Sequence, residues 1–386
     1  MRATGAAFAA TRAIAGAFVA LVLAGAAAQA DVKIGSVLSI TGPASFLGDP
    51  EKKTLEMYVA DINAQGGVNG QQIKLFIYDD GGDPNKARTF ATRLVEEDKV
   101  DAVLGGSITG TTMAMRGIYE DAEIPFIALA GAAEIVVPVR KWVFKTPHTE
   151  PMSCGKIFED MKKRNIGKIA MISGTDGWGK AMRAECIRMA PQAGITVLKD
   201  ESYGAADSDM TPQLTNIKAT PGVEAVINCG FGQGPAIVTR NYRQLGITVP
   251  LYQSHGVSSK SYIQLAGAAA EGVRLPAAAA IVADQLPAND PLKKVVVDYK
   301  TKFEKATGQP VSTFGGHMYD GLMILVEAMK RAKSADKGKV RDEIEKTKSF
   351  IGTGGMVNMS PTDHLGLDLT SFRMIEIKNG DWVLLN

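Results

Sequence analysis

Apolar runs of strand length alternate with amphipathic segments of helix length along most of the chain. Strands are expected at residues 32–40, 73–78, 102–104, 125–129, 168–172, 196–203, 225–229 and 251–253. Helices are expected between them, at residues 51–64, 84–97, 112–121, 152–164, 180–191, 209–219, 235–245 and 258–266. This alternation predicts right-handed crossovers and parallel sheets with helices on both faces. Because the series restarts near residue 150, it predicts an α/β fold with two doubly wound parallel-sheet lobes.

The pattern changes after Pro276. Helices are expected at residues 292–307, 318–333 and 340–348, and a hairpin at residues 372–377 and 382–385 around Asn379-Gly380. These elements are too few to form a third doubly wound domain, so we expect them to return to the earlier lobes. The expected lobes are residues 31–149 plus about 277–360, and residues 150–276 plus about 361–386.

The N-terminus has the pattern of a secretory signal peptide. Arg2 and Arg12 precede an apolar core at residues 13–25, and Ala28-Gln29-Ala30 forms a small-x-small cleavage site before Asp31. The core is too short to cross a bilayer, and no later stretch approaches the roughly 18 apolar residues that a membrane helix needs. No cysteine lies near the cleavage point, which argues against a lipid anchor. We therefore expect cleavage near Ala30, release into the periplasm and no direct membrane insertion.

Length and charge limit the fold and the partners of the exported chain. Removing residues 1–30 from 386 leaves 356, more than the roughly 250 to 300 residues that one hydrophobic core supports, so two domains are expected. The same removal takes two Arg and no acid from the 43 basic and 41 acidic residues, which leaves 41 of each. A formal charge of zero favours no polyanion, and we expect no nucleic-acid partner.

The cysteines and histidines show no metal-ligand spacing. Cys154, Cys186 and Cys229 make an odd number without a CxxC pair, so one disulfide and small buried thiols are equally compatible with the pattern. The four histidines lie far apart in the sequence. We expect no metal and no cofactor.

Three segments contain residues that occur in enzyme or metal sites, but none has the complete pattern of such a site. Residues 230–234 (Gly-Phe-Gly-Gln-Gly) follow a strand but lack the G-x-G-x-x-G spacing of a dinucleotide site. Ser107 has no G-x-S-x-G elbow around it. Residues 79–83 (Asp-Asp-Gly-Gly-Asp) could bind a hard metal ion, but Pro84 follows at once and favours a helix-capping turn. We therefore expect no catalytic residues, and we place the helix that carries His317 at the lobe interface.

Several motifs together carry a family resemblance. They are Ile40-Thr41-Gly42-Pro43 with Gly48-Asp49, residues 62–70, Tyr78-Asp79-Asp80 with Asp83-Pro84, Tyr119-Glu120-Asp121, Trp178-Gly179 and residues 266–272. With the order of elements, they resemble the periplasmic branched-chain amino-acid binding proteins of ABC importers, the leucine-binding family of type I solute receptors. The resemblance implies two lobes joined by three crossovers, a small solute in the cleft between them and a membrane permease as partner. A monomer is the default for a receptor that closes like a clamp.

Two loops are expected to form one wall of that cleft. Residues 105–110 and 130–133 follow the carboxyl ends of predicted strands, where helix N-termini favour an anion. The resemblance implies that a hydroxyl from the first loop, and backbone and hydroxyl groups from the second, hold the ligand carboxylate.

Each loop has one residue at the hydroxyl position of the family. Thr109 supplies the first hydroxyl, close to Ser107, whereas Ala132 stands at the second position and supplies none. The backbone of Ala130 and Ala132 can still bind the ligand. The alternative is that Ser107 and Thr109 only cap the following helix.

The opposite wall departs from the family pattern. The resemblance implies that a Glu carboxylate and a Tyr hydroxyl meet the ligand ammonium, and His255 and Phe231 occupy those positions. A buried ammonium without a carboxylate keeps its desolvation cost and loses a charge-assisted bond, a penalty of roughly 2 to 5 kcal/mol. His255 cannot replace an anion, but it can donate to a hydroxyl or to a second carboxylate.

Apolar and aromatic side chains complete the expected site, namely Phe46, Leu47, Trp178 and Phe231. Flat rings suit a flat ligand, and a ring pair adds about 0.5 to 1.5 kcal/mol beyond area burial. We therefore predict a receptor for a small carboxylate, an aromatic acid of the benzoate or cinnamate type. Three alternatives stay open: a receptor for a branched-chain or other hydrophobic amino acid, a soluble sensory binding protein, and a shifted alignment that leaves His255 in solvent.

Overall fold

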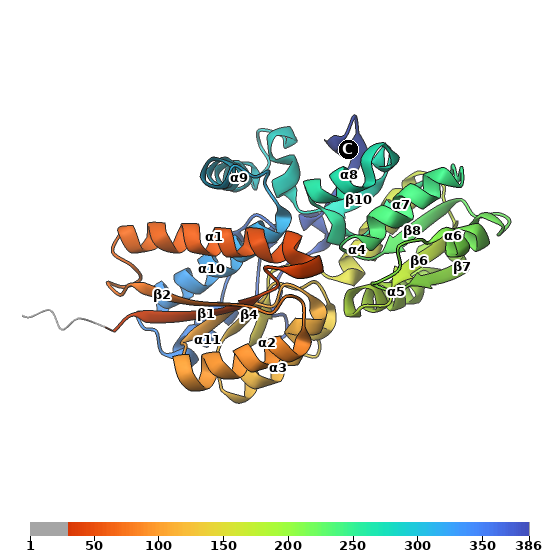
Figure 1. Cartoon of the computed structure of the whole chain (residues 1–386). Helices are drawn as coiled ribbons and strands as arrows, with labels where there is room; N and C mark the ends of the chain where they lie inside the picture. Colours follow the sequence, from red (N-terminus) through yellow and green to blue (C-terminus); the bar gives the residue numbers. More distant parts are fainter. Residues whose placement is uncertain (1–29, 386) are drawn as a thin grey trace, which may run out of the picture.

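The computed structural model describes residues 30–385, so the predicted signal peptide lies outside the described residues apart from Ala30. The first of two large sheets, which defines the first lobe, has five parallel strands in the order β2-β1-β3-β4-β5 (Figure 1). The strands are β1 (Val32–Leu38), β2 (Ile73–Asp79), β3 (Ala102–Gly105), β4 (Phe126–Ala128) and β5 (Val143–Lys145).

Helices cover both faces of this sheet because alternate strand residues face opposite ways. Ile34 and Leu38 pack with the helices on one face, whereas Val37 packs with those on the other. The first face carries α1 (Ser45–Ala64), α10 (Thr313–Ala332) and α11 (Lys337–Glu345). The second face carries α2 (Pro84–Arg93) and α3 (Thr109–Asp121). Figure 1 shows α1 and α10 above the sheet and α2 and α3 below it.

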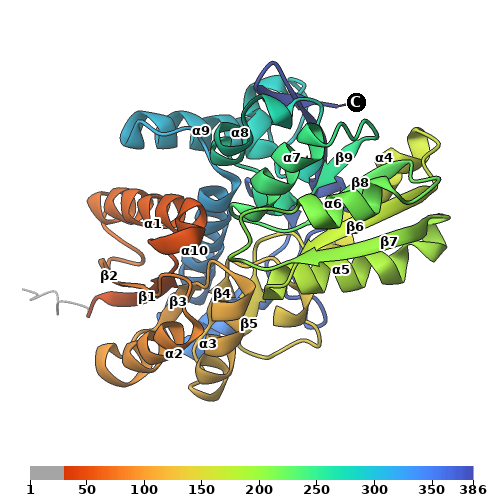
Figure 2. The same cartoon turned by 45° about the vertical axis from the view of Figure 1, so that its right-hand side comes forward.

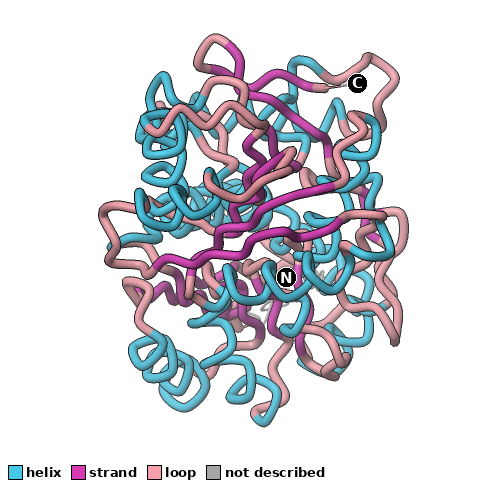
Figure 3. Tube along the Cα trace, turned by 90° about the vertical axis from the view of Figure 1, so that its right-hand side faces the viewer, coloured by secondary structure: helices cyan, strands magenta, loops and turns pink. Residues whose placement is uncertain are grey.

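The second sheet, which defines the second lobe, has the order β14-β13-β10-β9-β8-β6-β7. Its strands are β6 (Lys168–Gly174), β7 (Thr196–Tyr203), β8 (Ala225–Cys229), β9 (Leu251–Gln253), β10 (Arg274–Ala277), β13 (Arg373–Lys378) and β14 (Asp381–Leu384). One face packs against α4 (Glu150–Lys163) and α5 (Gly177–Met189). The other packs against α6 (Thr211–Lys218), α7 (Gly234–Gln244) and α8 (Lys260–Ala266). In Figure 3 most strands run through the middle of the molecule, and a hairpin lies at the upper edge near the C-terminus.

The chain passes between the two lobes three times. It leaves the first lobe between β5 and α4 and returns between β10 and α10 by way of α9 (Lys293–Thr307). After the small hairpin of β11 (Phe350–Ile351) and β12 (Met356–Val357), it crosses again to β13. Figure 2 shows α9 beside the second lobe, above α1. The predicted α/β fold with two lobes and three crossovers is therefore confirmed.

The second sheet is parallel over β7, β6, β8, β9 and β10, and the predicted C-terminal hairpin, which is confirmed as β13 and β14, adds two further strands at its edge. Strand β13 runs antiparallel to β10, and β14 antiparallel to β13. The hairpin turn at Asn379 and Gly380, whose φ angles of 55° and 70° are those of a type I′ turn, reverses the chain between β13 and β14. These two strands are therefore antiparallel to each other.

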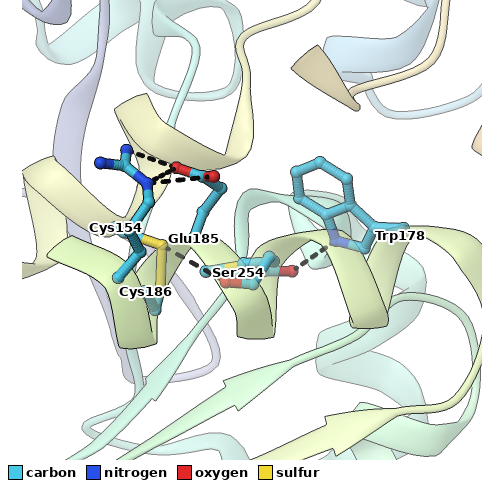
Figure 4. Close-up of a disulfide and its surroundings, with 7 residues drawn as sticks. Cys154, Trp178, Glu185, Cys186 and Ser254 are labelled. Atoms are coloured by element: carbon cyan, nitrogen blue, oxygen red, sulfur yellow. Dashed lines mark hydrogen bonds and ion pairs between the residues drawn. A yellow bond between two sulfur atoms is a disulfide. The ribbon is translucent and has the colours of Figure 1, made fainter. Parts of the chain in front are cut away.

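The three cysteines form one disulfide and one buried thiol. Cys154 on α4 and Cys186 on α5 are bonded, with their Cα atoms 5.2 Å apart (Figure 4). Cys229 is buried on β8, and burial raises the pKa of its thiol to about 12. Of the two open alternatives, the disulfide is the correct one, and it ties the helix that enters the second lobe to the next helix.

The aspartate cluster after β2 is a capping turn, as predicted. Asp83 is the N-cap of α2 and accepts from the backbone N–H groups of Asn85 and Lys86. Asp79 accepts from Ile40, Thr41 and Gly81. None of the helices in residues 30–385 is long and apolar enough to cross a bilayer.

Candidate functional site

A cavity lies between the two lobes, at the carboxyl ends of strands from both sheets. It contains about 430 Å³ of space not filled by protein atoms, its open side included. The first lobe contributes residues that follow β3 and β4, and the second contributes residues that follow β8 and β9. The lining residues are Leu47, Ser107, Ile108, Thr109, Leu129, Gly131, Pro147, Trp178, Phe231, His255, Gly256, Phe314 and His317.

Six of the eight predicted site residues line this cavity. They are Leu47, Ser107, Thr109, Trp178, Phe231 and His255. Ala130 and Ala132 are buried but do not belong to the lining, whereas Gly131 between them does. The structure therefore brings together the two walls predicted from separate parts of the chain.

The first turn of α3 offers backbone donors to the cavity. The N–H of Thr112 makes the first bond of the helix, to the carbonyl of Ile108. The N–H groups of Thr109, Gly110 and Thr111 precede it and so have no acceptor within the helix. Such a helix end attracts an anion through its N–H groups and its dipole.

Ser107 and Thr109 do not cap α3, so that alternative is wrong. The N-cap is Ile108, and no side chain caps the helix. The Ser107 hydroxyl donates to the Glu51 carboxylate and accepts from the backbone N–H of Ser39, at 3.0 Å. Burial raises the pKa of Glu51 well above its usual value. The proton of Ser107 is therefore engaged inside the first lobe, and Thr109 is the hydroxyl placed to meet a ligand.

The loop after β4 is held by two buried ionisable groups, since burial lowers the pKa of Lys145 to about 7 and raises that of Glu150. The Lys145 ammonium donates to the carbonyl of Gly131, and Glu150 accepts from the N–H of Ala133 at 2.8 Å. A methyl group on Gly131 would lie 2.6 Å from the Trp178 ring, so only glycine allows this contact between the lobes. Because the carbonyl of Gly131 already accepts from Lys145, it is less available to accept a hydrogen bond from a ligand.

Aromatic rings form much of the second-lobe wall. The Trp178 indole N–H donates to the Ser254 hydroxyl at 3.4 Å, a bond drawn in Figure 4. The Trp178 ring meets the His255 ring edge to face, with centroids 4.9 Å apart. Phe46, which was expected to complete the site, does not belong to the lining, although its ring centroid lies 6.5 Å from that of Phe231. A ligand here would meet flat apolar surfaces.

His255 is buried, which rules out the alternative that it points into solvent. It is 7% exposed, and His317 on α10 is 3% exposed. Burial lowers the pKa of each imidazole to about 3. Both rings are therefore neutral near pH 7. His148 lies behind them, with its ring stacked on Phe372 at 3.8 Å.

No carboxylate belongs to the lining of this cavity among the described residues. The nearby buried acids have other partners: Glu51 binds Ser107, and Asp320 accepts from the N–H groups of Thr353 and Gly354. Residues 30–385 also contain no group of three or more acidic, His or Cys side chains arranged to hold a metal ion. The lining is thus uncharged, with donors at α3 and two neutral imidazoles.

Two lining residues from α10 were not predicted as site residues. Phe314 and His317 are separated from the other lining residues along the chain and reach the cavity because α10 packs against the first sheet. The sequence analysis placed the helix of His317 at the lobe interface but gave no reason to select Phe314. Gly131 and Gly256 adjoin predicted residues and could have been found from them.

Two α/β lobes that hold a cavity between the carboxyl ends of their sheets define a solute-binding protein of the type I periplasmic class. The chain belongs to the periplasmic binding protein family, whose model matches residues 31–381. The relatives that match are solute-binding proteins rather than enzymes.

The similar proteins cover most of the chain. The leucine-, isoleucine-, valine-, threonine- and alanine-binding protein of Pseudomonas aeruginosa is 27% identical over 375 residues, which cover 95% of this chain and 94% of the relative. The Leu/Ile/Val/Thr-binding protein of Salmonella typhimurium is 27% identical over 300 residues, with 76% and 80% covered. The structure of an extracellular ligand-binding receptor from Rhodopseudomonas palustris HaA2 has a TM-score of 0.86 and 30% identity, and covers 92% of this chain and 100% of that one.

Proposed function

We propose that the chain is an extracytoplasmic receptor that delivers a small carboxylate ligand to the membrane permease of an ABC importer of the branched-chain amino-acid class. The family match and relatives of nearly the same length support this role. The signal-peptide pattern before Asp31 supports a periplasmic location after cleavage near Ala30.

The single observation that carries the ligand proposal is the uncharged lining of the cavity. The N-terminus of α3 offers backbone N–H groups and Thr109 to a carboxylate. The same cavity has no anion among the described residues for a ligand ammonium. Burying that ammonium unpaired costs roughly 2 to 5 kcal/mol. An acid without an amino group, with an aromatic body between Leu47, Trp178 and Phe231, fits this chemistry.

A branched-chain amino acid is the second candidate. The curated relatives are named for leucine, isoleucine and valine binding, and on these names alone it has the better support. Backbone carbonyls are the acceptors that an ammonium would then need in this cavity.

Equilibrium titration of ligand-free protein with leucine, phenylalanine and 4-hydroxybenzoate tests the proposal. Trp178 lines the cavity and provides a fluorescence signal that calorimetry can check. We expect 4-hydroxybenzoate to bind and both amino acids to bind at least tenfold more weakly, because 1.4 kcal/mol corresponds to about tenfold in affinity. Tight binding of leucine with weak binding of the aromatic acid would overturn the acid proposal and favour the amino-acid receptor.

A further inference from the structure

Two buried histidines line the cavity from different parts of the fold. His255 follows β9 in the second lobe, and His317 lies in α10, which packs against the first sheet. Nδ1 of each ring is buried and has no hydrogen-bond partner among residues 30–385. A buried polar atom without a partner carries an uncompensated desolvation cost. Because both rings belong to the lining and each leaves a ring nitrogen unpaired, the two rings can bind a polar group of a ligand.

The surroundings of these rings favour a neutral group over a charged one. His255 contacts the rings of Trp178 and Phe372, and its centroid lies 6.3 Å from that of His148. The nearby Lys145, whose pKa is lowered by burial to about 7, donates to the carbonyl of Gly131. Because burial keeps the pKa of both imidazoles far below 7, neither ring supplies a positive charge. A second carboxylate could accept a hydrogen bond from one ring, but neither it nor an ammonium would find an opposite charge in the described lining.

A neutral imidazole has one donor nitrogen and one acceptor nitrogen, and its tautomer adapts to the partner. A hydroxyl group is also both a donor and an acceptor. Two imidazoles can therefore satisfy one hydroxyl, one by donating to its oxygen and the other by accepting its proton. A carbonyl could use only the donors.

We propose that His255 and His317 together bind a hydroxyl group of the ligand, at the end away from its carboxylate. This inference rests on the proposed function, since it takes the carboxylate to lie at the N-terminus of α3. It narrows the ligand class to hydroxylated aromatic acids, whose hydroxyl meets the two rings while the aromatic body lies among Leu47, Trp178 and Phe231.

Matched ligand pairs test the inference without any variant. Benzoate is compared with 3- and 4-hydroxybenzoate, and cinnamate with 4-hydroxycinnamate, by calorimetry; terephthalate presents a second carboxylate. We expect a hydroxylated acid to bind at least about tenfold more tightly than its parent, and terephthalate no better than benzoate. Acids that bind equally well with and without the hydroxyl, or tighter binding of terephthalate, would overturn the inference and leave the acid receptor standing. Binding of leucine without any of the acids would overturn both.

Three variants then locate the contact. His255→Phe and His317→Phe keep a ring and remove its nitrogens, so each is expected to reduce the ratio of the affinities for the hydroxylated acid and its parent toward onefold. His148→Phe is the matched control, because His148 belongs to the same cluster but not to the lining. We expect it to retain the preference. Equal loss in all three variants would overturn the assignment, since altered packing of the cluster would explain it.

Discussion

Ser107 and Thr109 lie two residues apart, yet their hydroxyl groups have different surroundings. Ser107 connects Glu51 to the backbone of Ser39 inside the first lobe. Thr109 stands in the first turn of α3 and lines the cavity. The first hydroxyl therefore stabilises the fold, whereas the second is placed to bind a ligand.

Two substitutions separate these roles. Ser107→Ala removes the donor to a buried carboxylate and is expected to lower the free energy of unfolding by about 1 to 3 kcal/mol while changing ligand affinity little. Thr109→Val keeps the shape of the side chain and is expected to weaken carboxylate binding about tenfold with little effect on stability. Urea unfolding and calorimetry measure the two quantities. A larger loss of affinity in Ser107→Ala than in Thr109→Val would contradict this assignment.

His255 and His317 make stability depend on pH. The pKa of each is about 3 in the folded chain, against a usual value of 6.5. Between these values only the unfolded chain binds the protons, so this contribution to stability is complete above pH of about 6.5 and is lost as the pH falls toward 3.

The double variant His255→Phe, His317→Phe removes this dependence. Between about pH 6.5 and 4.5 the wild type is expected to lose on the order of 1 kcal/mol per pH unit per histidine more than the variant does. Urea unfolding of both ligand-free proteins measures the difference. Asp320, whose pKa is raised by burial to about 7, has the opposite pH dependence, but it occurs in both proteins and cancels. Parallel curves of stability against pH would show that the histidines are not buried and neutral.

The disulfide acts on two neighbouring helices. Cys154 and Cys186 are 32 residues apart, and their bond links α4 to α5, which carries Trp178 at the cavity. Closing a loop of this length stabilises a protein by roughly 3 to 4 kcal/mol in the chain-entropy account.

Replacing both cysteines by alanine tests that contribution. The double variant Cys154→Ala, Cys186→Ala is expected to lose roughly 3 kcal/mol of unfolding free energy. Cys229→Ala is the matched control, because it removes a buried thiol without a bond. Urea midpoints of the three proteins decide the matter: a control as unstable as the double variant would assign the loss to packing alone.

Local patterns predict the long elements well, because a helix such as α9 or a strand such as β7 shows its periodicity within one window. Strand β5 was missed because its apolar run is only Val143 and Phe144, between Trp142 and the buried Lys145, and β10 was missed because Pro276 lies within it. The sequence could not show that Cys154 pairs with Cys186 rather than with Cys229, because the pairing depends on how α4 and α5 pack. The same holds for Phe314 and His317, which only the packing of α10 brings to the cavity.

At the scale of the whole molecule, the two lobes jointly form one binding site. Residues after β3 and β4 face residues after β8 and β9, and the Trp178 ring of one lobe reaches the Gly131 backbone of the other. A ligand that contacts both walls binds more tightly when the two lobes are close together. It therefore shifts the population toward the arrangement with the lobes closed over it. The lining among the described residues contains no carboxylate. We therefore expect a ligand without an amino group.

The most direct measurement compares acids that differ from amino acids only by the ammonium. Calorimetry of ligand-free protein with 3-phenylpropanoate against phenylalanine, and with 4-methylpentanoate against leucine, isolates the contribution of that group. We predict that each acid binds at least tenfold more tightly than its amino counterpart, because an unpaired buried ammonium costs roughly 2 to 5 kcal/mol. Tighter binding of phenylalanine or leucine than of the matching acid would contradict the account.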